Sequence, residues 1–114
     1  MDRYEELVSS NPENCSATEY RYIGALIEKY APGNILVFSV GRDSSLWMDL
    51  NKGGNTVFLE DVRKWIKFSR NITPEINIVK VNYSTKRKNW KKFLGQDHKL
   101  QMRLPDFIKN TVWD

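Results

Sequence analysis

Apolar positions in this chain alternate between strand-like runs and helix-like spacing. Three short runs, at 35–40, 56–59 and 76–83, are rich in β-branched and aromatic residues and too short for buried helices, so they predict strands. Apolar residues recur every three or four positions before the first run and between the runs. This spacing predicts helices at 18–30, after residue 41 to about 50, and at 62–69.

The order of these elements predicts the fold. Strands that alternate with helices are typical of a parallel sheet, so we expect an α/β, Rossmann-like, three-layer α/β/α arrangement. Residues 1–16 have few periodic apolar positions and predict a short helix or arm, and 17–114 form the domain. The first strand should be covered on both faces. The helix that opens at Ser16 or Thr18 should pack through one face, made of Tyr22, Ile23, Leu26, Ile27 and Tyr30.

The end of the first strand carries a glycine turn. Gly41 permits a tight turn and leaves room for a ligand, and Asp43, Ser44 and Ser45 are candidates to cap the next helix. Glu60 ends the second strand 19 residues later. That interval is close to the roughly 20 residues at which an acid meets ribose hydroxyls in dinucleotide folds. An ordinary strand-to-helix turn is the alternative interpretation.

The turn lacks the further glycines of a pyrophosphate site, so a phosphate-free nucleoside cofactor such as S-adenosylmethionine fits it better. The Glu60 carboxylate is the candidate acceptor for both ribose hydroxyls, and Asp61 faces the adenine edge or solvent. Asp43 either caps the helix or binds the methionine end of the cofactor. The candidate cofactor contacts at this edge of the sheet are Ser39, Val40, Gly41, Asp43, Ser44, Glu60, Asp61 and Tyr83.

The segments 34–47 (Asn-Ile-Leu-Val-Phe-Ser-Val-Gly-Arg-Asp-Ser-Ser-Leu-Trp) and 50–61 (Leu-Asn-Lys-Gly-Gly-Asn-Thr-Val-Phe-Leu-Glu-Asp) carry a resemblance, together with Tyr83-Ser-Thr85. From about Thr18 onward the chain resembles the plant glucuronoxylan 4-O-methyltransferase family, also called the polysaccharide biosynthesis domain family. The resemblance implies a Rossmann-like enzyme that uses S-adenosylmethionine to methylate a sugar hydroxyl, with glucuronate on xylan as the best-known acceptor.

Three departures from the family pattern qualify this expectation. Arg42 stands where the family has histidine, Ser39 stands where it has glycine, and the strand that follows Trp113-Asp114 in family members is not in this sequence. The chain therefore resembles the N-terminal half of the domain, an incomplete methyltransferase fold. The resemblance implies direct methyl transfer to a hydroxyl oxygen, but no residue is identified as the base.

Basic residues cluster after the third strand. The net charge is +4, and 86–92 hold five basic residues and Trp90. This segment is either a solvated helix face or a surface that attracts a polyanion. The resemblance favours an acidic polysaccharide over nucleic acid, with Arg42, Lys86 and Arg87 as candidate substrate contacts. The alternative function is a non-catalytic binding or assembly module whose basic face contacts RNA or a protein partner.

Composition narrows the remaining choices. A chain of 114 residues with 40% hydrophobic residues can build one small core. His98 has no second histidine or cysteine at metal-ligand spacing, so we predict no metal site. No run approaches the roughly 18 apolar residues of a membrane span. Plant relatives are Golgi proteins, but no signal here assigns a compartment. An open sheet edge predicts a partner chain or a homo-oligomer.

Overall fold

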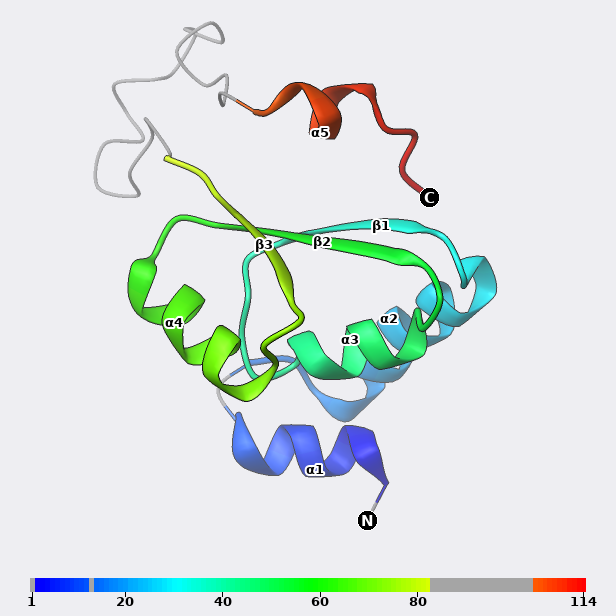
Figure 1. Ribbon diagram of the computed structural model, residues 1–114. Coiled ribbons are helices and arrows are strands. Elements are labelled where there is room, and N and C mark those ends of the chain that lie inside the picture. The colour runs from blue at the N-terminus through cyan, green and yellow to red at the C-terminus, as the bar shows by residue number, and fades with distance from the viewer. Residues whose placement is uncertain (1, 13, 83–103) are drawn as a thin grey trace, which may run out of the picture.

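The computed structural model describes residues 2–12, 14–82 and 104–114. Helices and strands alternate along the described chain as the sequence predicts (Figure 1). The elements are α1 (Arg3–Ser10), α2 (Ala17–Tyr30), β1 (Asn34–Phe38), α3 (Ser44–Leu50), β2 (Asn55–Glu60), α4 (Arg63–Ile72), β3 (Asn77–Lys80) and α5 (Asp106–Asn110).

The three strands form one parallel sheet in the order β1-β2-β3. Helices α1 to α4 lie on one side of the sheet and α5 lies on the other (Figure 1). Because the strands are parallel, their carboxyl ends meet at one edge, where Phe38 is paired with Leu59 and Glu60 with Lys80. The predicted α/β, Rossmann-like arrangement with parallel strands is confirmed.

The central strand β2 supplies the centre of the core. Val57, Phe58 and Leu59 have no exposed surface. Phe58 packs in a cluster with residues of α1 to α4, whereas Val57 and Leu59 pack with Ile108 of α5. The first strand, β1, is an edge strand that is covered on both faces as predicted but only in part, because Val37 packs against the α1 to α4 cluster and Leu36 against the α5 cluster. Its first four residues are half-buried, and Phe38 is 61% exposed.

Helix α2 begins as predicted but buries a different face. Ser16 is its N-cap and forms a capping box with Glu19, which fixes the first turn. The buried residues are Tyr20, Gly24 and Ile27, at spacings of four and three. Of the predicted packing face only Ile27 is buried. The exposed members are Tyr22, Ile23, Leu26 and Tyr30.

The predicted N-terminal arm contains helix α1, which starts with a capping box between Asp2 and Glu5. The buried Leu7 anchors it in the core. Arg3 also forms an ion pair with Asp49 of α3 at 2.6 Å, but both side chains are exposed, so the pair contributes little stability.

The C-terminal segment returns to the start of β1. The Asp114 N–H donates to the Asn34 carbonyl at 2.8 Å, and the Asn34 N–H donates to the Asp114 carboxylate at 2.7 Å. The Trp113 indole N–H donates to the Ile108 carbonyl at 2.9 Å, which holds this segment to α5. Within the described ranges, no helix combines the length and the apolar character needed to cross a membrane.

Candidate functional site

The buried carboxylate of Glu60 joins the carboxyl ends of β1 and β2. Its Oε1 accepts hydrogen bonds from the Ser39 hydroxyl at 3.1 Å and from the Val40 N–H at 3.0 Å. Its Oε2 accepts from the N–H groups of Asp61 at 2.9 Å and Val62 at 3.0 Å. Four donors fill the roughly four acceptor positions of a carboxylate. Glu60 therefore holds the turn after β1 against the turn after β2.

The pKa values of the adjacent Glu60 and Asp61 are shifted in opposite directions. Burial, the largest single effect, would raise the pKa of Glu60, but the hydrogen bonds that it accepts, led by those from Val40 and Val62, together outweigh burial and leave that pKa below its usual value. The pKa of Asp61 is raised, first by desolvation and then by the neighbouring Glu60 carboxylate. Asp61 is nevertheless solvent-exposed, so its carboxylate can accept hydrogen bonds from a ligand hydroxyl.

The turn after β1 has its left-handed residue at Ser39 and not at Gly41. Ser39 has φ 86°, a conformation that favours glycine, and its N–H donates to the Leu59 carbonyl at 2.6 Å. Gly41 has no such φ. A Cβ added at Gly41 would meet the Asp43 Oδ1 at 3.4 Å, an ordinary contact. The fold thus does not require glycine at position 41.

Asp43 does not cap α3 with its side chain as predicted. Asp43 occupies the N-cap position, but its side chain makes no capping hydrogen bond, and its φ of −86° and ψ of −11° are helical. A capping side chain normally accompanies an extended backbone. The buried Ser44 hydroxyl instead accepts from the Gly41 N–H at 2.9 Å. Ser44 therefore closes the turn, and Asp43 lies at the start of α3 without the predicted capping role.

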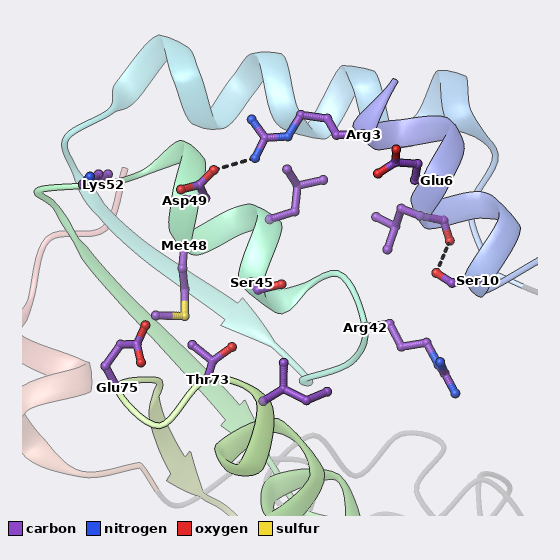
Figure 2. A pocket seen from close by; sticks show the side chains of 13 residues that line it. Arg3, Glu6, Ser10, Arg42, Ser45, Met48, Asp49, Lys52, Thr73 and Glu75 are labelled. Atoms are coloured by element: carbon purple, nitrogen blue, oxygen red, sulfur yellow. Dashed lines mark hydrogen bonds and ion pairs between the residues drawn. The ribbon is translucent and has the colours of Figure 1, made fainter. Parts of the chain in front are cut away.

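Arg42 lines the edge of a cavity of about 700 Å³ among α1, α3 and the loop before β3, and its guanidinium extends away from Ser45 and Arg3 (Figure 2). Its guanidinium lies 5.7 Å from the centre of the Phe68 ring of α4. Arg3 and Asp49 close the cavity at the α1 side, and Met48 points toward Glu75 across it (Figure 2). Arg42 also lines a small cavity together with Gly41 and Ser44, so its side chain lies beside the turn after β1.

An apolar groove of about 430 Å³ runs between α2 and the edge strand β1. Ile23, Leu26 and Tyr30, the unburied part of the predicted α2 packing face, line it together with Phe38. Asp43 also lines this groove, near the buried Trp47. Trp47 is buried in the core, whereas Trp65 is 37% exposed.

The structure brings Ser39, Val40, Glu60 and Asp61 together, and Gly41 and Ser44 form the adjoining turn. Tyr83, Lys86, Arg87 and His98 lie outside the described residues. Sequence reasoning missed Val62, because its part in the cluster comes from its backbone N–H, which no residue type reveals. The described residues contain no group of His, Cys, Asp or Glu side chains that could hold a metal.

Residues 18–114 match the model of the IRX15/IRX15L/GXM family. Three similar proteins come from Arabidopsis thaliana. The chain is 39% identical to glucuronoxylan 4-O-methyltransferase 2, and the match covers 78% of this chain and 36% of that protein. It is 31% identical to arabinogalactan O-methyltransferase 1 over 78% of this chain and 37% of that protein. It is 35% identical to Protein IRREGULAR XYLEM 15 over 68% of this chain and 24% of that protein. No solved structure matches the chain.

Proposed function

The chain belongs to the IRX15/IRX15L/GXM family, and from this premise we propose that it is the cofactor-binding part of a polysaccharide O-methyltransferase. The methyl donor is S-adenosylmethionine, and the acceptor is a sugar hydroxyl of a glucuronoxylan-type polysaccharide. The names of the relatives support methyl transfer to a polysaccharide. The choice of S-adenosylmethionine rests on the turn after β1, which lacks the further glycines of a pyrophosphate site. The chain spans little more than a third of these relatives, so the activity of the whole enzyme is part of the proposal.

The observation that carries the proposal is the hydrogen-bonded junction between the tips of β1 and β2. Parallel α/β sheets bind ligands at the carboxyl ends of their strands, and here Glu60 fixes the position of an exposed acid, Asp61, at that edge. Because the acceptor positions of Glu60 are filled, we assign ribose recognition to the Asp61 carboxylate. Glu60 is then a positioning residue, which modifies the role expected from the sequence.

The turn residues fit the remainder of the cofactor. A fold that tolerates a Cβ at Gly41 leaves that space available to a ligand. Ser39, Val40 and Ser44 belong to the hydrogen-bonded turn beside it, and Asp43 stands at the start of α3. Tyr83 lies outside the described residues and stays a prediction from the sequence. When bound, the cofactor supplies a methyl group on a positively charged sulfur. The chain binds and orients it, and we assign no base among the described residues.

Calorimetric titration with S-adenosylmethionine and S-adenosylhomocysteine tests the proposal. We expect both to bind, and Asp61→Asn to weaken binding by about tenfold, the effect of losing one charge-assisted hydrogen bond. Asp106→Asn on α5 is the matched control, since it removes one exposed acid on the other side of the sheet. A folded chain that binds neither compound would contradict the proposal.

The apolar groove supports a second candidate function, a binding or assembly module. Leu26 is 41% and Phe38 61% exposed beside the edge strand β1, and exposed apolar surface of this kind is typical of a protein interface. We propose that a polypeptide partner covers this edge. Light scattering of the chain alone distinguishes a homo-oligomer from a monomer that awaits another partner. Leu26→Asp should abolish association, whereas Ile72→Asp, also at an exposed apolar residue, should not.

A further inference from the structure

Helix α4 carries a stripe of positive charge. Arg63, Lys67 and Arg70 follow one another at spacings of four and three residues, which puts them on one face of the helix. With Lys80 of β3 they line a groove of about 620 Å³, here called the α4 groove. Its lining residues are Arg63, Ile66, Lys67, Arg70, Asn71 and Lys80, and none of these six is acidic.

Among the described residues, no ion pair neutralises the four cations of the α4 groove, and Asp61 acts on Lys80 only at longer range. The ion pairs among the described residues are formed by Arg3 and Arg21, which lie on α1 and α2. Arg70 makes one long contact, 3.5 Å to the Ile78 carbonyl, and the Lys80 amine lies 3.3 Å from the amide oxygen of Asn82. Four cations around one groove repel each other, and a bound anion relieves that repulsion.

The α4 groove starts beside the candidate cofactor site. Lys80 is paired with Glu60 in the β2-β3 register, and its charge lowers the pKa of Asp61 against the larger effects that raise it. Arg63 begins α4 only two residues after Asp61. From Arg63 the stripe continues to Arg70, about 10 Å along the helix axis at the usual rise per residue. A chain-like anion in the groove would therefore pass the edge of the sheet at which we propose methyl transfer.

We infer that the α4 groove binds a carboxylate-bearing polysaccharide, the acidic stretch of the acceptor. The polysaccharide identity rests on the proposed function, whereas the preference for an anion does not. Arginine presents a planar fork that matches a carboxylate, and the Asn71 amide can pair with sugar hydroxyls. Single-stranded nucleic acid is disfavoured, because its binding sites combine cations with aromatic rings that stack on bases, and the lining contains no aromatic residue.

A charge-matched pair of double variants tests this inference. The groove variant combines Arg63→Gln with Lys67→Gln. The control variant combines Lys64→Gln with Lys109→Gln, which removes the same charge from α4 outside the groove and from α5. The probe is a xylan oligosaccharide bearing glucuronate, titrated into the full chain at low salt. We expect the groove variant to bind about tenfold more weakly and the control to stay within about twofold.

Four outcomes would overturn the inference. They are equal weakening by both double variants, equal affinity for uncharged xylan oligosaccharide, tighter binding of single-stranded RNA of the same charge, and no binding of the acidic probe. All substituted residues are exposed, so thermal unfolding of both variants should match that of the unaltered chain. Cofactor titration is measured separately. Glycan binding without cofactor binding would reject the proposed function alone, and the reverse would reject the groove alone.

Discussion

The Oε1 of Glu60 lies 3.0 Å from the backbone nitrogen of Val40, and this contact joins the tip of β2 to the turn after β1. The same carboxylate accepts three further hydrogen bonds, two of them from the backbone that follows it. An acid in this position stabilises the edge of the sheet whether or not a ligand is bound. Loss of ligand binding in a Glu60 variant would therefore mix structural and functional effects.

Glu60→Gln should destabilise the fold. A glutamine amide keeps one acceptor oxygen and replaces the other with a donor, so at least one buried or part-buried backbone N–H loses its partner. We expect the free energy of unfolding to fall by about 2 kcal/mol, within the usual cost of an unsatisfied buried group. Urea denaturation measures this change. Glu28→Gln on the exposed face of α2 is the control, and equal stability of the two variants would reject the structural role of Glu60.

Stability should depend on pH with opposite contributions from the two acids. The pKa of Glu60 is lowered from 4.5, so its contribution is present above that pH and is lost as the pH falls through the folded-state pKa. The pKa of Asp61 is raised from 3.8, so its ionisation opposes folding as the pH rises through the folded-state value. Asp61→Asn should thus be more stable than the unaltered chain at neutral pH and equal to it near pH 2. Chemical denaturation of both proteins between pH 2 and neutral pH measures the difference in stability. A difference that does not change with pH would contradict the prediction.

Substitutions at Ser39 should separate backbone strain from hydrogen bonding. Ser39→Gly relieves the cost of the left-handed conformation, about 1 kcal/mol, but loses the hydrogen bond to Glu60 of similar value. We therefore expect little net change in stability. Ser39→Ala keeps the strain and loses the bond, so it should be less stable by about 1 kcal/mol. Chemical denaturation of the pair is the measurement, and an alanine variant more stable than the glycine variant would refute this account.

Gly41→Ala should leave the fold intact and impair the proposed cofactor site. The nearest atom to an added Cβ is the Asp43 Oδ1 at 3.4 Å, so the folded state can accept it. Removing a glycine also lowers the entropy of the unfolded chain, and stability should be equal or higher by about 0.5 kcal/mol. Affinity for S-adenosylhomocysteine should fall about tenfold, because the methyl group fills space assigned to the ligand. Unchanged affinity in a folded variant would indicate an ordinary turn.

The order of the helices and strands was predicted from the sequence better than the side chains that each element buries. Glycine and proline around β1, α3 and β2 interrupt the chain locally, so the element order could be predicted without knowledge of the fold. The burial of α2 could not, because it depends on which elements pack against each helix face, and Tyr20 was buried in place of Tyr22. The role of Glu60 was only half predicted. Its position at a strand tip follows from spacing, but its saturation by backbone donors depends on how two turns meet.

The hydrogen bonds between Asn34 and Asp114 have a consequence for how the protein folds. They join residues 80 positions apart, whereas the paired residues Asn34 and Asn55 of β1 and β2 are separated by 21. Loop-closure entropy grows by about 0.6 kcal/mol for each doubling of length, so the C-terminal contact costs about 1.2 kcal/mol more to close. The contact between Asp114 and Asn34 should therefore form after the pairing of β1 with β2, so that the C-terminal segment is among the last parts of the chain to dock.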